Sequence, residues 1–305
     1  MKFSGHETFP IREGWLHKGL KLLAHEPQLF LNDEVSDVLG IGRNMAKSLK
    51  HWLQATGLAE QAGADAKSSV ASLRMTKLGE LIWERDRFLM EIGTWWILHI
   101  NLIRERDVAS TWYWYFNKFN HDRFDRAVCL ESLRRYIDSE QKRVPSSSTI
   151  QRDLGCMLLS YARSIPSANE DPEDGADCPF RELGLLNYYK TSGQYQIHQG
   201  VKNIPLEVFC YSMSVAFSDS LARTKVSDIR LHDATRQAAG PGRAFCLTGE
   251  SLFETVSRLE DAAKDKEIQI AGIAGDRAIR IQSLSPFEWI ERFYHNSVAE
   301  NTYAI

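Results

Sequence analysis

The stretch from Asn32 to Thr76 constrains the fold more than any other part of the chain. Asn32 is a typical helix-capping residue, and the acidic segment Asp33 to Leu39 that follows suits the positive end of a helix dipole. Gly40-Ile41-Gly42 then favours a tight turn, because glycine adopts backbone conformations that other residues avoid. The next run, Arg43 to Gln54, predicts a second helix that packs on the first, since apolar residues recur in it at helical spacing: Met45, Ala46, Leu49, Trp52 and Leu53.

The opposite face of this second helix is basic and carries no acid. No Asp or Glu occurs between Val38 and Ala59, and Gly57 is placed to end the helix. A face of this kind suits phosphates and base edges, so we expect it to contact DNA. The candidate contact residues on it are Arg43, Asn44, Lys47, Ser48, Lys50 and His51.

Two short strand candidates follow, from Leu58 to Gln61 and from Val70 to Met75. The Gly/Ala/Asp/Ser-rich loop between them predicts a hairpin wing, with Lys67 at its tip and Arg74 on its edge. The sequence thus predicts an N-terminal winged helix-turn-helix. Many such units only pack against other domains, and the basic helix is what favours a nucleic-acid partner here.

Composition sets the broad class of protein. A chain of 305 residues exceeds what one hydrophobic core usually serves, and its formal charge of −3 leaves DNA binding to local patches. The polar start offers no signal peptide, and the most apolar window, Leu89 to Ile103, is too short to span a bilayer. The five cysteines are widely and singly spaced, so we expect reduced thiols and no zinc site. A cytoplasmic protein without a membrane segment is expected.

The pattern divides the chain into three blocks and predicts a mainly α fold with small β-hairpin wings. Residues 1–120 hold the N-terminal motif, the winged helix-turn-helix and an apolar core helix, and residues 121–225 form a helical middle domain with an acidic loop. Residues 226–305 resemble a winged-helix module, with a helix from Ser251 to Ala263 and then a hairpin around Gly275. Arg277 and Arg280 would lie on this wing. The hairpin between Tyr188 and Ile197 repeats the same order of elements.

Five aromatic residues follow one another from Trp112 to Phe116. Aromatic rings on every face of a helix cannot all be solvated, so we expect this segment to lie between the first and second blocks. An exposed platform for stacking bases is the alternative.

The N-terminal segment is the densest unusual cluster of polar side chains. His6 and Glu7 could form a general acid/base pair or supply metal ligands. Alternatively, they hold the N-terminus against the protein by hydrogen bonds, because a polar N-terminus without tertiary partners would fray.

Several segments together carry a resemblance that spans nearly the whole chain. The opening, Phe3 to Gly19, has the pattern F-S-G-H-E-T-F-P-x-R-x-G-W-L-x-K-G, and four later segments accompany it: Trp112 to Asn117, Ser148 to Asp153, Asp177 to Phe180, and Pro241 to Phe245. The chain resembles a prokaryotic family of initially unknown function that is encoded beside DNA-phosphorothioation genes. This is the family of the B component of the single-strand phosphorothioation system.

The resemblance implies a DNA-binding protein of an antiphage defence operon that nicks one strand so that sulfur can enter the backbone. It also implies partners: a cysteine desulfurase, an ATP-pyrophosphatase-type sulfur transferase and an ATPase. A nickase of this kind would use Mg²⁺ or another divalent cation, which needs converging carboxylates.

The residues by themselves do not identify a nuclease. Candidate carboxylates are Glu7, Asp153 and the acidic segment from Glu170 to Asp177, and a solvated loop is the alternative for the last. Two functions therefore stay open: a DNA-processing nickase, and a non-catalytic DNA-binding scaffold or transcriptional regulator.

Overall fold

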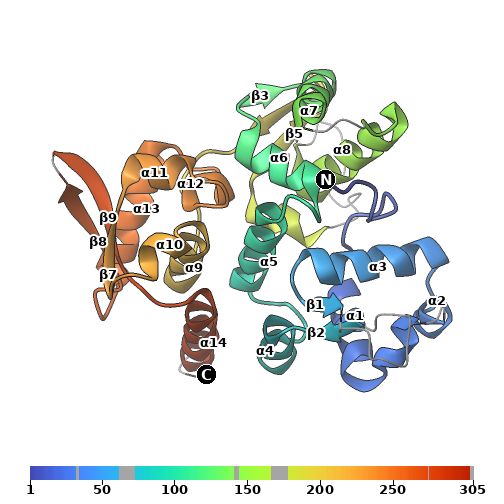
Figure 1. Cartoon of the computed structure of the whole chain (residues 1–305), viewed down its shortest axis with the longest axis horizontal. Coiled ribbons are helices and arrows are strands. Elements are labelled where there is room, and N and C mark those ends of the chain that lie inside the picture. The colour runs from blue at the N-terminus through green and yellow to red at the C-terminus, as the bar shows by residue number, and fades with distance from the viewer. Residues whose placement is uncertain (32–33, 62–72, 141–143, 166–177, 274, 303–305) are drawn as a thin grey trace. The chain divides into compact units, whose positions relative to one another are not determined.

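The structure is a computed structural model of the chain, and it describes residues 1–31, 34–61, 73–140, 144–165, 178–273 and 275–302. The chain divides into two compact units, Met1–Gln196 and Ile197–Ile305. In both, helices outnumber short strands (Figure 1), which confirms a mainly α fold with small β-sheets. None of the described helices has the length and apolar character needed to cross a membrane.

The first half of unit 1 holds the predicted order of two helices and a hairpin. Its elements are α1 (Trp15–His25), a 3₁₀ helix (Pro27–Leu31), α2 (Val35–Leu39), α3 (Arg43–Ala55), β1 (Ala59–Gln61), β2 (Leu73–Met75) and α4 (Lys77–Arg85). Strands β1 and β2 pair antiparallel, with Ala59 opposite Met75. Asn32, Asp33 and Lys67 lie outside the described residues.

Two glycines end the helices α2 and α3. Gly40 ends α2 with φ 62°, and the Ile41 N–H donates to the carbonyl of Ser36. Gly57 has φ 77°, and the Leu58 N–H donates back to the carbonyl of Leu53. Both glycines adopt the left-handed conformation that commonly terminates helices, which is the role the sequence predicted for Gly57.

The second half of unit 1 is built around a buried helix. Its elements are α5 (Ile92–Arg104), α6 (Ser110–Lys118), β3 (Arg123–Phe124), α7 (Arg126–Glu140), α8 (Ser147–Tyr161), β4 (Ala162–Ile165), a 3₁₀ helix (Pro179–Leu183), β5 (Leu186–Tyr189) and β6 (Gln194–Ile197). Every residue of α5 from Gly93 to Ile103 is buried, as expected for a core helix. The four strands form one sheet in the order β3-β6-β5-β4, in which β4 and β5 run parallel.

The aromatic helix α6 lies where the first predicted block, residues 1–120, meets the second, residues 121–225. Trp112 and Trp114 are only 1% and 2% exposed, so the stacking-platform alternative does not apply to them. Helix α6 contacts α5, α7 and α8. The predicted boundary at residue 120 therefore lies inside one compact unit, and the boundary at residue 225 lies inside the other. The shared aromatic core is the physical reason for the first difference.

Unit 2 contains the predicted C-terminal hairpin within a larger sheet. Its elements are α9 (Leu206–Ala216), α10 (Ser218–Leu221), β7 (Val226–Arg230), α11 (Leu231–Arg236), α12 (Pro241–Ala244), α13 (Gly249–Ala262), β8 (Ile268–Ile273), β9 (Asp276–Gln282) and α14 (Pro286–Thr302). Strand β9 pairs with β8 and also with β7, so the sheet has three strands in the order β7-β9-β8. Helices α9 and α14 pack against each other, as do α13 and β8.

Candidate functional site

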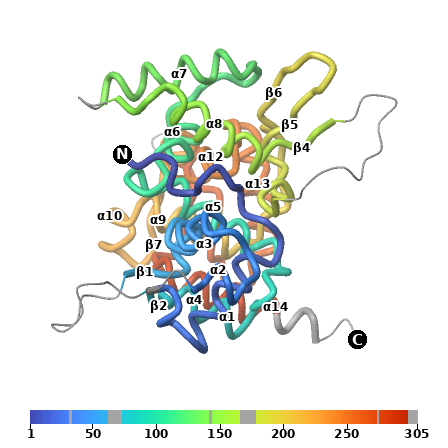
Figure 2. Tube along the Cα trace, turned by 90° about the vertical axis from the view of Figure 1, so that its right-hand side faces the viewer, coloured from blue at the N-terminus to red at the C-terminus, as the bar shows by residue number. Residues whose placement is uncertain are grey.

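The N-terminal arm, residues 1–14, is bound into unit 1 rather than frayed. Figure 2 shows it as the dark blue tube that runs past α6, α8 and α3 before α1 begins. The backbone N–H of Lys2 donates to Ser110 Oγ at 2.6 Å, at the start of α6. On α3, Ser48 Oγ and Trp52 Nε1 both donate to the carbonyl of Phe9. The arm thus links α6 to α3.

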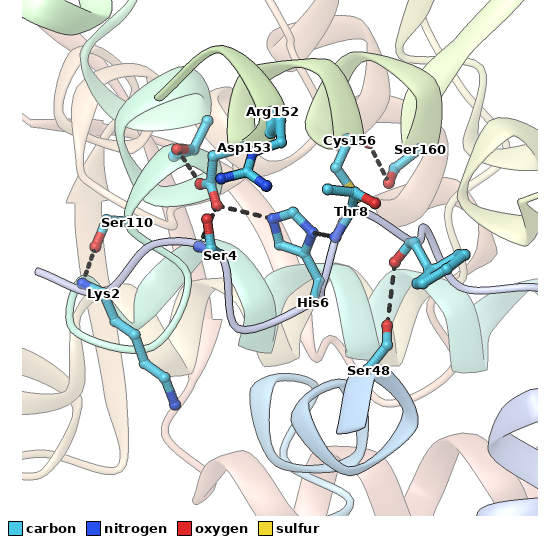
Figure 3. A network of polar contacts seen from close by, with 12 residues as sticks. Lys2, Ser4, His6, Thr8, Ser48, Ser110, Arg152, Asp153, Cys156 and Ser160 are labelled. Carbon is cyan, nitrogen blue, oxygen red and sulfur yellow. Dashed lines mark hydrogen bonds and ion pairs between the residues drawn. The ribbon is translucent and has the colours of Figure 1, made fainter. Parts of the chain in front are cut away.

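Asp153 of α8 is the centre of the arm's polar contacts (Figure 3). Its Oδ1 accepts from the Ser4 N–H at 2.6 Å and from His6 Nε2 at 2.8 Å, while its Oδ2 accepts from the hydroxyl of Thr111. Asp153 is only 1% exposed. A buried carboxylate is costly unless donors surround it, and here both oxygens have them.

The contacts of His6 fix the protonation pattern of its ring. The Thr8 N–H donates to Nδ1 at 3.1 Å, so Nδ1 carries the lone pair and Nε2 carries the proton that is given to Asp153. The ring stacks on Trp52 at 5.9 Å between centroids and meets the Trp112 ring at 5.3 Å. Both ring nitrogens are therefore occupied by the protein. A general base needs an open nitrogen, and the geometry here is that of an anchor.

Glu7 does not form the pair that its position beside His6 suggested. The carboxylate that His6 meets is Asp153, which comes from a different helix. Glu7 and Thr8 both have positive φ, 48° and 75°, because the backbone turns sharply here: the Glu7 N–H donates to the Ser4 carbonyl. This turn aims the His6 ring inward.

His51 lies beneath the arm and is buried, which corrects its expected place on the exposed face of α3. Its ring packs so closely on Gly5 that a Cβ there would lie 2.5 Å from His51 Nδ1. Burial lowers the pKa of His51 from 6.5 to about 3, with smaller contributions from His6 and Lys2. Within the described part of the chain, Nδ1 has no hydrogen-bond partner. Ser48, fully buried, also faces the arm.

Four further residues were predicted on the polar face of α3, and three of them lie in its first turns. Arg43, Asn44 and Lys47 are exposed, whereas Lys50 is half-buried and donates to the carbonyl of Phe30 at 3.4 Å. The apolar side of α3 is buried, as the sequence predicted, since Leu49 and Leu53 are 1% and 0% exposed. The open polar face of α3 is therefore its N-terminal part.

The arginines predicted on the two wings all have partners within the protein. Arg74 forms an ion pair with Glu60 on the opposite strand, with 2.9 Å between Nη2 and Oε1. In unit 2, Arg280 contacts both oxygens of Asp228 at 2.8 Å, and the guanidinium of Arg277 lies 4.3 Å from the ring centre of Phe253. The ion pairs are solvent-exposed, and water and salt weaken such pairs, so they can yield to a stronger partner.

The described residues do not fit a metal site. Across the described ranges, no three side chains of His, Cys, Asp or Glu lie close enough together to hold an ion. Both oxygens of Asp153 already accept hydrogen bonds. The acidic segment at residues 170–177 lies outside the described residues. The cysteines are free thiols, and burial raises the pKa of Cys178 and of Cys246 to about 11.

The sequence interpretation missed the His6–Asp153 contact, although a signal for a buried Asp153 exists. Ile150, Leu154 and Met157 mark the apolar face of α8, and Asp153 falls on that same face. A carboxylate on a core-facing stripe must find donors. The spacing does not say that those donors come from the arm and from α6.

Fold and site together define a two-unit, mainly helical protein whose N-terminal arm is fastened by a buried histidine–aspartate pair. The family model described as "Protein of unknown function (DUF4007)" matches residues 3–294, and the chain belongs to this family.

Two solved structures are similar to the chain over most of its length. The "SspB crystal structure" has 26% sequence identity and a TM-score of 0.79, and the "Magnesium ion-bound SspB crystal structure" has 26% identity and a TM-score of 0.80. Each comparison covers 97% of this chain and 88% of the other. No curated protein matches the sequence.

Proposed function

We propose that the protein binds DNA through a winged helix-turn-helix composed of α2, α3 and the β1–β2 hairpin. The observation that carries this proposal is the exposure of Arg43, Asn44 and Lys47 at the N-terminal part of α3. In helix-turn-helix proteins, base edges are read by the N-terminal residues of the second helix. Two cations and an amide at that place suit phosphates and bases.

The packing of α3 supports this orientation. Leu53 and Leu49 lie so close to Gly19 of α1 that a Cβ on Gly19 would be 2.8 Å from a methyl group of Leu53. Helix α3 therefore has its apolar face fixed on α1, and its first turns remain open. Arg74 belongs to the proposed surface of unit 1, and its exposed ion pair with Glu60 can exchange for phosphate. Arg277 and Arg280 of unit 2 are proposed as separate DNA contacts. Lys50 and Lys67 are proposed as further DNA contacts. Ser48 and His51 would contact DNA only if the N-terminal arm moved away from α3.

We further propose that this DNA binding serves a system that places phosphorothioate in the DNA backbone. Similarity to SspB over 97% of the chain supports this role, together with the opening motif from Phe3 to Gly19. The partners of such a system would be a cysteine desulfurase, an ATP-pyrophosphatase-type sulfur transferase and an ATPase. Its place in antiphage defence follows from the same resemblance.

Nicking of one DNA strand is the activity we propose within that system. One of the two similar solved structures is a magnesium ion-bound SspB, which supports a divalent cation in that protein. Among the described residues of this chain, no group of three His, Cys, Asp or Glu side chains could hold such an ion, and His6 and Glu7 are proposed as catalytic residues from the sequence alone. The alternative is a non-catalytic scaffold or a transcriptional regulator. The hydrogen bonds of His6 favour this alternative, because they occupy both ring nitrogens of a candidate general base.

One assay on supercoiled plasmid separates the nickase from the scaffold. The full chain is incubated with plasmid, with and without Mg²⁺, alone and together with the proposed partners. Conversion to the open circular form supports nicking, and a Glu7→Gln variant then tests the carboxylate. Retention of the supercoiled form under all conditions, with DNA bound, contradicts nicking and leaves the scaffold.

A further inference from the structure

A stack of three rings lies on unit 1, formed by α1, α4 and the turn that follows α4. The imidazole of His17 on α1 stacks between Trp83 of α4, at 5.9 Å, and Phe88 of the α4–α5 turn, at 4.7 Å between centroids. The interplanar angles are 26° and 29°, so the rings are nearly parallel. We call Trp83, His17 and Phe88 the ring stack.

The end of this stack is open. Phe88 is 64% exposed although His17 covers one of its faces, so the uncovered area is the opposite face and the ring edge. Met90, two residues on, is 82% exposed. Phe88 thus offers a free ring face on which another planar ring can stack, whereas Met90 is an exposed neighbour outside the ring stack.

The turn that presents Phe88 is held rigidly. Asp86 accepts hydrogen bonds from the N–H groups of Met90 and Glu91 and from the hydroxyl of Thr94. Leu89 is buried, and its carbonyl accepts from Trp95 Nε1 at 2.9 Å. The outward direction of Phe88 is therefore built into the turn. A ring that is already ordered binds with little entropic cost.

The His17 ring is fixed as well. Its Nδ1 lies 2.7 Å from the carbonyl of Arg87, and a carbonyl only accepts, so Nδ1 carries the proton and donates. This bond ties the middle ring of the stack to the backbone beside Phe88. The stack is thus a preformed flat platform, with one hydrogen bond setting its orientation.

Cations accompany the platform on α1 and on the α4–α5 turn. The guanidinium of Arg87 lies 5.2 Å from the centre of the Trp83 ring, whose edge also meets His25 of α1 at 6.1 Å. Lys21, exposed, is one helical turn from both His17 and His25, so it projects from the same side of α1. Exposed acids are also present on α4, at Glu80 and Glu84. Parallel rings beside cations match a nucleobase with its phosphate.

We infer that the ring stack is a binding site for a base of single-stranded nucleic acid, which would continue the stack on the free face of Phe88. The inference rests on the proposed function, because handling one strand follows from processing DNA. It places base stacking at Phe88 rather than at the buried aromatic run of α6. Aromatic rings beside a basic groove are the usual means of binding single strands without sequence preference.

The test uses the full chain and three labelled probes: a thymidine oligonucleotide, a strand of equal length with abasic sites, and a duplex. Dissociation constants come from fluorescence anisotropy. Phe88→Ala should weaken binding of the thymidine strand roughly tenfold, as loss of one base–aromatic stack does. Phe88→Tyr should restore it. Met90→Ala is the matched control, because it removes an exposed apolar side chain that is not a ring, and it should bind as the wild type does.

The abasic strand keeps the experiment independent of any variant's folding. The wild type should bind it about tenfold more weakly than the thymidine strand, because the phosphates remain and the stacking partner is gone. Equal binding of the two strands overturns the inference. An equal loss in Phe88→Ala and Met90→Ala also overturns it and indicates a protein-docking patch. Duplex binding reports on the proposed function separately, since these variants leave α3 untouched.

Discussion

His6 Nε2 and Asp153 Oδ1 lie 2.8 Å apart, although 147 positions separate the two residues in the sequence. The pair closes the N-terminal arm onto α8 in a place where neither side chain is more than 2% exposed. A salt bridge or hydrogen bond of this kind adds little when intact but costs much when one partner is lost. The conformation of the arm therefore depends on both residues.

Removing either member of this pair should destabilise unit 1 before it affects any activity. For His6→Ala and Asp153→Ala we expect a loss of about 1–3 kcal/mol in the free energy of unfolding, because a buried polar partner is left unsatisfied. Chemical denaturation measures this loss. Glu7→Gln is the control and should change stability little. A His6 variant that is stable and binds DNA, yet has lost nicking, would show that His6 is catalytic rather than an anchor.

Acid should weaken the fold through His51. Its pKa is about 3 in the folded protein against an ordinary 6.5, so the unfolded chain takes up the proton first as the pH falls. Stability from this residue is complete above pH 6.5 and falls below it, by at most about 1.4 kcal/mol per pH unit, until the folded pKa is reached. Burial raises the pKa of Asp86, so protonation of this carboxyl group favours the folded state as the pH falls. This effect is opposite to that of His51.

The comparison of wild type with His51→Gln isolates the histidine, since Asp86 is common to both. Unfolding free energies between about pH 7 and pH 4 should converge as the wild type loses its advantage. The control variant His121→Gln replaces an exposed histidine, and its unfolding free energy should follow the same pH dependence as that of the wild type. Parallel profiles for wild type and His51→Gln would contradict a neutral buried His51.

The aromatic core predicts a large effect at Trp114. This ring is 2% exposed and packs on Phe119 at 5.1 Å between centroids. Trp114→Ala should lower the free energy of unfolding by roughly 3 kcal/mol or more, because it leaves a large cavity. Tyr113→Ala, at the half-buried neighbouring position, should cost clearly less. Equal losses at the two positions would mean that the core does not centre on Trp114.

Local patterns predicted the elements of the fold well where periodicity and glycine positions agree. Leu49 and Leu53 are buried and Gly57 ends α3, because helical spacing and left-handed glycine are properties of short segments. The cap of α8 at Ser146 is also a local feature, and its side chain accepts from the Thr149 N–H. By contrast, Phe124 pairs with Tyr195 in the sheet just before α7 begins at Arg126, and the local pattern does not indicate this distant partner.

The contacts of the candidate site could not be read from the sequence in the same way. Ser48 and His51 fall on the polar side of α3, which favoured solvent, yet the arm covers them. Nothing in the spacing of α3 indicates which distant segment will lie over it. Arg74 and Arg280 look like free cations in sequence, and only strand register places Glu60 and Asp228 opposite them.

The open first turns of α3 are the central claim, and the salt dependence of duplex binding tests it most directly. Dissociation constants are measured over a series of salt concentrations for wild type, Arg43→Ala, Lys47→Ala and Lys118→Ala, the last an exposed cation on α6 as control. Each phosphate contact contributes about 0.9 to the slope of log K against log salt. Arg43→Ala and Lys47→Ala should each weaken binding and reduce the slope by about that amount, while Lys118→Ala keeps the wild-type slope. Unchanged affinity and slope in both α3 variants would show that this helix does not touch DNA.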